Sequence, residues 1–345
     1  MPSRQYIVAF EDLIERDAAR AGVKNTALGN LWRQTHLQGV RFPPGFVLTT
    51  DAYRAFADHN GLPRVIQNAV AAIGRDRTHP FAAALTIRSA FERSAFPDDL
   101  RGQLLRAYRR LWERNGEDVA VRVSATEKDF PGSGATGGAR LHVVGESALL
   151  SAVRDRFASL YTEAAIRARE ASGLDQLTPG VALGVQRMVR SDLGCAGTLS
   201  WGDEETGYAE TVLISAAWGL GGGIVEGGID PDEYRVRIRL GSERDLAPVI
   251  TRRRGAKLFK VIYDAEAGEQ RCVPTTANER NADTLDDQDL VKLAQWAAII
   301  ERACPMVAEV EWAKDGRSGE IFVIESRSQT LAARTQTAAD AVALA

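Results

Sequence analysis

Residues 119–138 read VAVRVSATEKDFPGSGATGG, and the fold prediction starts from this stretch. Valines at positions 119, 121 and 123 alternate with Arg122 and its neighbours, which predicts a half-buried strand with one guanidinium on its polar face. Four glycines follow between positions 132 and 138, and glycine lets a loop turn its amides toward a bound anion. A strand-borne arginine followed by such a loop suits a polyphosphate, while a long surface hairpin is the alternative that this stretch leaves open.

The composition is typical of a soluble globular protein. The chain has 345 residues, 45% of them apolar and 26% charged, with a formal net charge of -3. This balance lacks the basic excess that binding along a nucleic acid needs. The N-terminus has no signal-peptide pattern, and no apolar run reaches membrane-spanning length. Cys195, Cys272 and Cys304 lie far apart, without metal-ligand spacing or a disulfide framework, so we expect a cytoplasmic protein.

Lys24 stands at the predicted start of a helix, directly after a glycine turn at Gly22. A cation there opposes the helix dipole unless an anion also binds at that end, so Lys24 is either a phosphate-binding residue or an exposed lysine at a small cost.

Helices and strands alternate along the rest of the chain. We expect a helical insert over residues 64–114 and a helix capped by Ser147. A glycine- and proline-bearing loop at 172–180 predicts a boundary between two lobes, followed by a strand at 181–189. Further strands are expected near 196–201, 211–217 and 233–240, and Thr284-x-x-Asp287 predicts the start of a helix.

Two segments leave their roles open. Trp218 to Gly223 reads WGLGGG, which suits a mobile lid as well as a plain connector. A second segment is rich in basic residues and is either a solvated face or a docking site for an acidic partner. Its members are Arg252, Arg253, Arg254, Lys257 and Lys260.

Two strands at 307–313 and 320–327, joined by a short glycine-bearing turn, predict a β-hairpin. It would bring Glu311 and Glu325 near one another, with Arg327 on the face of Glu325. Carboxylates in apolar strands need a cation or a donor, and a pair of hard oxygen ligands suits Mg²⁺ bound to a nucleotide. The alternative is that both glutamates point to solvent from an edge hairpin.

Seven segments resemble, in order and rough spacing, the nucleotide-binding domain of phosphoenolpyruvate synthase, which pyruvate phosphate dikinase and rifamycin phosphotransferase share. The segments are Lys24-Asn25-x-x-Leu28-Gly29, 43–50, 119–126, Val185-Gln186-x-Met188-Val189, Trp218-Gly219-Leu220-Gly221, Pro231-Asp232-Glu233-Tyr234 and Glu311-Trp312-Ala313. The resemblance covers nearly the whole chain.

The resemblance implies an α+β, two-lobed ATP-grasp fold with mostly antiparallel sheets, closing on Mg-ATP. The lobes would span residues 1–180 and 181–335, with an alanine-rich tail at 336–345. It also implies roles for individual residues. Lys24, Arg122 and Arg327 would hold the phosphates, and Glu311 and Glu325 would hold Mg²⁺. The loop would cover the phosphates through Gly132, Gly134, Thr136, Gly137 and Gly138, and Gln186, Met188 and Val189 would form the adenine hinge.

The sequence departs from the family at several of these places. Val23 stands where a glycine is usual, and Val123 replaces a serine. Gly138-Ala139-Arg140 takes the place of Gln-Gln-Glu in the phosphate loop, Gly222 that of a glutamate, and Glu325 that of a glutamine. The loop would then contact the γ-phosphate through backbone amides.

Full-length relatives continue into a domain whose histidine takes phosphate from ATP and a domain that binds the acceptor. None of the four histidines here lies in the family's Thr-Ser-His or Gly-x-x-Ser-His setting. We therefore expect a phosphohistidine-bearing partner on a separate chain, which also binds a small-molecule acceptor. This organisation resembles the ATP-binding subunit of phenylphosphate synthase, which phosphorylates phenol.

The resulting hypothesis is an AMP-forming phosphotransferase subunit that passes the β-phosphoryl group of ATP to the partner's histidine. Two alternatives stay open. One is a split phosphotransferase with pyruvate, a drug or another small molecule as acceptor. The other is a regulatory subunit that senses ATP without chemistry.

Overall fold

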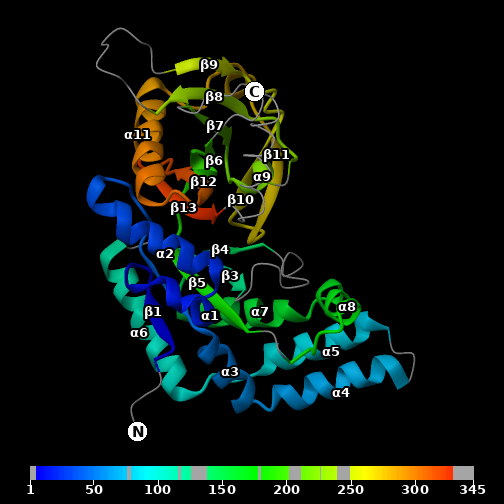
Figure 1. Cartoon of the computed structure of the whole chain (residues 1–345). Coiled ribbons are helices and arrows are strands. Elements are labelled where there is room, and N and C mark those ends of the chain that lie inside the picture. The colour runs from blue at the N-terminus through cyan, green and yellow to red at the C-terminus, as the bar shows by residue number, and fades with distance from the viewer. Residues whose placement is uncertain are drawn as a thin grey trace, which may run out of the picture. The chain divides into compact units, whose positions relative to one another are not determined.

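The structure, a computed structural model, describes residues 5–75, 79–115, 118–125, 138–177, 180–201, 211–225, 227–238 and 249–328. The chain forms two compact units (Figure 1). Unit 1 comprises Met1–Asn30 and Pro44–Met188, and unit 2 comprises Leu31–Pro43 and Val189–Ala345. Helices combine with antiparallel sheets in both units, so the predicted α+β class is confirmed.

Unit 1 contains a five-stranded sheet in the order β1-β2-β5-β3-β4, in which every pair is antiparallel. The strands are β1 (Ile7–Ala9), β2 (Gly45–Leu48), β3 (Val119–Ala125), β4 (Arg140–Val143) and β5 (Val181–Arg187). The strand predicted at Val119 is therefore present. It lies inside the sheet and is more buried than predicted, because Ala120 and Ser124 are also buried on the face opposite the valines.

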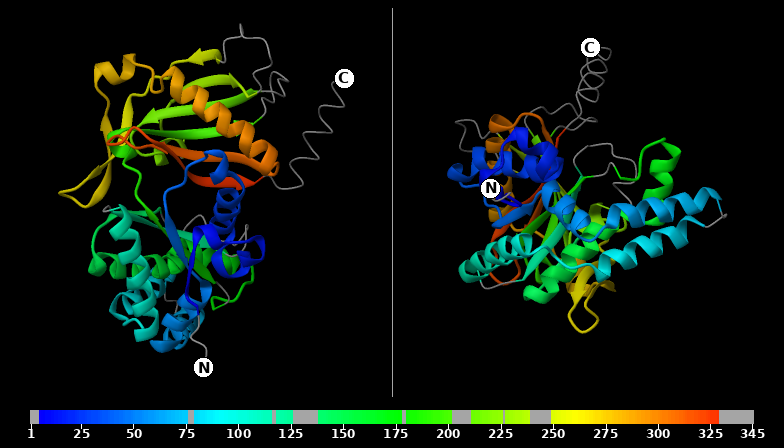
Figure 2. Two further views of the ribbon diagram at one scale, coloured as in Figure 1. Left: turned by 90° about the vertical axis from the view of Figure 1, so that its left-hand side faces the viewer. Right: turned by 90° about the horizontal axis from the view of Figure 1, so that it is seen from below.

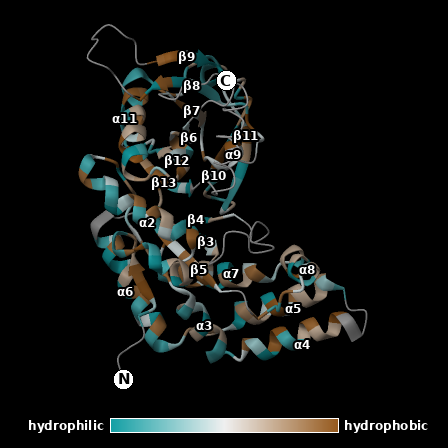
Figure 3. Cartoon of the chain, in the orientation of Figure 1, coloured by the Kyte–Doolittle hydropathy of each residue, from teal (hydrophilic) through white to brown (hydrophobic). Residues whose placement is uncertain are grey.

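Six helices share one core with the valine face of this sheet. They are α3 (Thr50–His59), α4 (Leu62–Arg75), α5 (Pro80–Arg93), α6 (Asp98–Asn115), α7 (Glu146–Ala158) and α8 (Glu163–Ala171). Unit 1 also contains α1 (Ala18–Ala21) and the start of α2 (Val23–Thr35), which continues into unit 2. The predicted helical insert corresponds to α4, α5 and α6. Its apolar residues, including Phe91 and Leu104, belong to the same core as Val121 and Leu183 of the sheet. Hydrophobic and hydrophilic residues alternate along these helices (Figure 3), as expected for helices with one buried side.

Unit 2 contains a six-stranded sheet in the order β13-β12-β6-β7-β8-β9 and a separate two-stranded sheet, β10-β11. Its strands are β6 (Cys195–Trp201), β7 (Thr211–Trp218), β8 (Asp232–Arg237), β9 (Val249–Arg253), β10 (Phe259–Asp264), β11 (Glu269–Pro274), β12 (Val307–Lys314) and β13 (Ile321–Ser328). The strands predicted near 196–201, 211–217 and 233–240 and the C-terminal hairpin are thus all present.

Helix α11 (Asp287–Ala303) lies across one face of the six-stranded sheet, against β6, β7 and β8 (Figure 2). The predicted apolar positions of this helix, from Leu290 to Ile300, are buried. The opposing sheet face is apolar, with Leu199, Ile214 and Val310 fully buried. Alternation along the strands therefore places the carboxylates of β12 on the other face, which we call the polar face, together with the apolar residues Ala196, Ala313 and Phe322. The described part of unit 2 also contains two short helices, α9 (Gly222–Val225) and α10 (Ala277–Asn281).

Three local predictions differ from the structure. The residue before α7 is Gly145, with a φ of 88°, so Ser147 lies inside the helix and does not cap it. Asp286 caps α11 by accepting from the backbone N–H of Asp289, so Thr284 is not the cap. The division between the units falls after Met188 and not after Gly180, because β5 is hydrogen-bonded to both β2 and β3 of unit 1.

Among the described residues, no helix is long and apolar enough to cross a membrane.

Candidate nucleotide-binding site

Arg122 lies on the face of the unit 1 sheet that points away from the helical core. It pairs with Gly184 of β5, two residues from Gln186, which is buried and pairs with Ala120. Residues two apart on a strand share a face, so Arg122, Ser124 and Gln186 lie on one side of the sheet.

The N-terminus of α2 packs against this same side. Gly22 has a φ of 81°, and a Cβ there would lie 2.5 Å from the carbonyl oxygen of Ser124. The backbone N–H of Asn25 donates to Ser124 Oγ at 3.3 Å, and a Cβ at Gly184 would lie 2.7 Å from Asn25 Oδ1. Lys24 is exposed. The structure thus brings Lys24, at the predicted helix start, to the face that carries Arg122.

The predicted adenine hinge runs from Gln186 to Val189, where the chain leaves unit 1 for unit 2. The backbone N–H of Arg187 donates to Pro44 at 2.9 Å, and that of Met188 donates to Asp118 at 2.8 Å. These bonds extend the sheet pairing of β5 to the end of the unit. The segment is therefore a rigid support, whose binding role stays a prediction.

The glycine-rich loop is described only at its end. Gly132, Gly134, Thr136 and Gly137 lie outside the described residues. Gly138 is exposed, and its carbonyl oxygen accepts a hydrogen bond from Nη1 of Arg156, a buried residue of α7. This contact attaches the end of the loop to the helix.

In unit 2, a β-bulge places Glu325 on the polar face of the sheet. Trp312 pairs with Val323, but the next pair is Glu311 with Glu325, so Ile324 is the extra residue of β13. Without the bulge, Glu325 would pair with Val310, on the face that α11 covers. Bulges often re-aim a side chain in this way beside active sites. The predicted proximity of Glu311 and Glu325 is confirmed.

Arg327 lies between two carboxylates of β12. Its Nη2 donates to Glu311 Oε1 at 2.9 Å, and its Nη1 is 3.5 Å from Glu309 Oε1. The sequence pattern did not single out Glu309, although its position two residues before Glu311 puts it on the same face. The carboxylates of Glu309, Glu311 and Glu325 repel one another, so a cation between them is stabilising. The guanidinium of Arg327 provides part of that positive charge.

The donor set fits Mg²⁺ in part. Glu311 and Glu325 pair directly, so both carboxylates can reach one ion, and hard oxygen ligands that leave room for water and phosphate suit Mg²⁺. Within the part of the chain that the structure describes, no group of three or more His, Cys, Asp or Glu side chains could hold a metal ion. Two carboxylates alone leave most of the coordination positions of Mg²⁺ to other oxygens, and the role of the pair as a metal site stays a prediction.

An apolar patch adjoins this cluster on the same face. Val189 packs with Ala196, Ala313 and Phe322, and Ile324 of the bulge packs against them. Ala313 and Glu309 are four residues apart on β12, which is about 13 Å at 3.3 Å per residue. Along β12, a buried apolar residue is therefore followed by carboxylates, and the guanidinium of Arg327 on β13 lies beside them.

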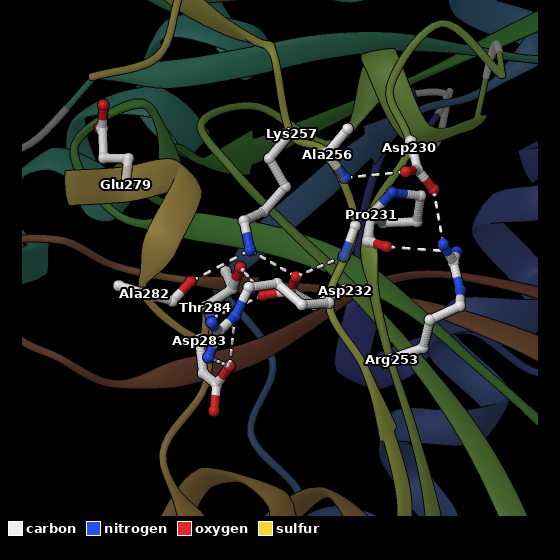
Figure 4. Close-up of polar contacts among 12 residues, drawn as sticks. Asp230, Pro231, Asp232, Arg253, Ala256, Lys257, Glu279, Ala282, Asp283 and Thr284 are labelled. Atoms are coloured by element: carbon white, nitrogen blue, oxygen red, sulfur yellow. Dashed lines mark hydrogen bonds and ion pairs between the residues drawn. The ribbon is translucent and has the colours of Figure 1, made fainter. Parts of the chain in front are cut away.

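The Pro231-Asp232-Glu233-Tyr234 segment has a structural role that the sequence did not reveal (Figure 4). Asp232 and Lys257 are both buried and form an ion pair. Asp232 also accepts hydrogen bonds from the backbone N–H and the hydroxyl of Thr284, at 2.9 and 2.7 Å, and Lys257 Nζ donates to the Ala282 carbonyl at 3.0 Å. Burial opposes ionisation, but the hydrogen bonds from Lys257 and Thr284 hold the pKa of Asp232 below its ordinary value.

The basic segment around residue 252 is neutralised by carboxylates. Each of its members forms an ion pair with an acidic residue from elsewhere in unit 2. The pairs are Arg252 with Asp283 and Asp287, Arg253 with Asp230 and Glu233, Arg254 with Asp283, Lys257 with Asp232, and Lys260 with Glu279. These ion pairs favour a neutralised face over a basic docking surface.

The Trp218–Gly223 segment is attached to β10. Gly219 bridges to Val261, and the backbone N–H of Leu220 donates to the Val261 carbonyl at 2.8 Å. These contacts favour a fixed connector over a lid.

Replacing Gly219 by alanine tests this attachment. Gly219 has a φ of 87°, and a Cβ there would collide with the Val261 carbonyl. Left-handed backbone costs an L-residue about 1–2 kcal/mol, and the collision adds to that cost. Gly268→Ala is the matched control, because Gly268 has a φ of 70° and open space around it. Urea denaturation should show a greater loss of unfolding free energy for Gly219→Ala than for Gly268→Ala. Equal losses would mean that the contact is loose.

The family described as "Pyruvate phosphate dikinase, AMP/ATP-binding domain" matches residues 18–344. Phosphoenolpyruvate synthase of Synechocystis sp. is 34% identical over 342 residues, which covers 94% of this chain and 42% of the relative. The enzymes of Helicobacter pylori and Escherichia coli are 33% and 34% identical and cover 95% and 97% of the chain. The chain belongs to the pyruvate phosphate dikinase AMP/ATP-binding domain family. It spans 42% or 43% of the length of these relatives.

Proposed function

We propose that this chain binds Mg-ATP and transfers the β-phosphoryl group to a histidine on a partner subunit. The γ-phosphoryl group is transferred to water and leaves as orthophosphate, and AMP is the remaining product. The observation that carries the proposal is the polar face of unit 2, where Glu311, Glu325 and Arg327 adjoin an apolar patch.

The chain's residues act by positioning and by charge. Lys24, Arg122 and Arg327 are the residues that would stabilise negative charge on the phosphate oxygens. Glu311 and Glu325 hold Mg²⁺, which neutralises phosphate charge when it is bound. Gln186, Met188 and Val189 form the hinge that holds the adenine base, through backbone groups as much as side chains.

The histidine belongs, in this proposal, to a partner subunit that also binds the final acceptor. The relatives named above are phosphoenolpyruvate synthases that are longer than this chain, which is compatible with a histidine supplied from further sequence. Phenol is the acceptor that the sequence resemblance favours. Another small molecule is the alternative within the same chemistry.

A regulatory subunit that senses ATP is the second candidate. One observation favours it. Arg140 pairs with Val121, and its Nε donates to Asp155 of α7 at 2.6 Å, so Arg140 points to the face opposite Arg122. The residue that ends the altered loop thus does not reach toward the phosphate-facing side.

Labelled ATP separates the two candidates. The chain is incubated with ATP labelled at the β or the γ phosphorus, with and without a protein that carries the family's histidine domain. We expect β label on the histidine protein, together with AMP. Label from the γ position would refute a dikinase reaction, and nucleotide binding without any transfer would favour the sensor.

A further inference from the structure

A row of side chains crosses the six-stranded sheet of unit 2 at the level of the carboxylate pair. The register pairs Glu311 of β12 with Thr198 of β6, and Thr198 with Ser215 of β7. Directly paired residues of an antiparallel sheet share a face, with Cβ atoms about 4.5–5.5 Å apart. Thr198 is partly exposed. It is therefore the neighbour of Glu311 on the side away from Glu325.

Gly197 and Trp312 fix Thr198 in this position. A Cβ at Gly197 would lie 2.6 Å from Cζ2 of Trp312, so the indole ring occupies the space beside this glycine. Trp312 is fully buried, and its Nε1 donates to the Thr198 carbonyl oxygen at 3.2 Å. The ring thus ties β12 to β6 at the level where Glu311 and Thr198 meet.

Thr198 stands where the polar face changes its chemistry. On one side, Ala196 pairs with Ala313 and belongs to the apolar patch. On the other side, Ser200 pairs with Glu309. The partly exposed side chain of Thr198 therefore lies between the buried apolar residues and the carboxylates of β12.

We propose that the Thr198 hydroxyl is a third oxygen donor at the metal–triphosphate site that Glu311 and Glu325 form, an inference that rests on the proposed function. Two carboxylates leave most of the six positions that Mg²⁺ prefers to other oxygens, and hydroxyls near a metal orient its ligands. Thr198 supplies one such oxygen on the side of Glu311 that no carboxylate of β13 reaches. Its contribution therefore depends on the metal.

Binding of a non-hydrolysable ATP analogue, measured by calorimetry with and without Mg²⁺, tests this dependence. Thr198→Val removes the hydroxyl and keeps a β-branched side chain that suits a strand. We expect about tenfold weaker binding in the presence of Mg²⁺, the loss of one hydrogen bond to a charged group, and unchanged binding in its absence. Thr198→Ser keeps the hydroxyl and should bind like the original chain.

Thr251→Val is the matched control. Thr251 is an exposed threonine of β9 that pairs with Arg235 on the same sheet, far along the strand order from β12. It should leave binding unchanged with and without Mg²⁺. Thr198→Val binding that is unchanged with Mg²⁺, or weakened equally with and without it, would overturn the role of Thr198. Failure of the unaltered chain to bind the analogue would instead overturn the proposed function, and this inference with it.

Discussion

Replacing Glu311 by glutamine should lower phosphotransfer from ATP by about 10²-fold or more, because removing one charge-matching group at a transferring phosphate typically has that effect. The amide keeps the size of the side chain and removes the negative charge that attracts both Mg²⁺ and Arg327. Arg327 would retain Glu309, at 3.5 Å, as its remaining partner on β12. The measurement is the rate of AMP formation with a histidine-bearing partner, together with the Mg²⁺ concentration at half-maximal rate.

Glu320→Gln is the control for this variant. Glu320 directly precedes β13 and forms an ion pair with Arg41, at the opposite end of the strand from Arg327. It should leave AMP formation unchanged. AMP formation by Glu311→Gln within a few-fold of the unaltered chain would exclude Glu311 from the site. An equal loss in both variants would show that the hairpin acts only through its stability.

Elements with local signals were predictable from the sequence. The alternation at Val119 and the helical spacing from Leu290 to Ile300 each arise from one buried face of one element. The C-terminal hairpin has a short turn, so its pairing follows from chain direction alone. For the same reason, the placement of Glu311 and Glu325 on two neighbouring strands was predictable, but their direct pairing on one face was not.

Features that depend on distant partners were missed. Thr284 matches the pattern of a helix cap, but its hydroxyl binds Asp232, 52 residues earlier. The basic run at 252–254 looks like a charged surface because its carboxylate partners come from two other segments, at 230–233 and 283–287. Local patterns contain no information on such pairs.

The boundary between the units was placed too early for a related reason. The loop before β5 has the glycine and proline content of a linker, whereas the pairing of β5 with β2 and β3 is long-range. The bulge at Ile324 is also invisible locally, since strict alternation between paired strands would have sent Glu325 to the helix-covered face. The bulge shifts the pairing of β13 with β12 by one residue, and this shift places Glu325 opposite Glu311 on the same face.

The largest effect on stability is expected at Lys257. Its side chain is fully buried against Asp232, so Lys257→Met would leave a buried carboxylate without its cation. Breaking a buried ion pair from one side typically costs about 3–5 kcal/mol of unfolding free energy. Lys260→Met is the control, because the pair of Lys260 with Glu279 is partly exposed and should cost about 1 kcal/mol or less. Urea denaturation at neutral pH measures both.

Acid should reduce the difference between Lys257→Met and the unaltered chain. The pKa of Asp232 is lowered in the folded chain, so its ionised form contributes stability that is fully present above the ordinary value of 3.8 and is lost as the pH falls through the folded-state pKa. In Lys257→Met, Asp232 loses the ammonium group that favours its ionised form, so its pKa in the folded variant is higher than in the unaltered chain. As the pH falls, Asp232 is therefore protonated first in the variant, and its protonation removes the cost of burying an unpaired carboxylate. The stability gap between the two should therefore narrow as the pH is lowered from 7 toward 4. A gap that stays constant over this range would show that the loss comes from packing of the lysine stem and not from the charge of Asp232.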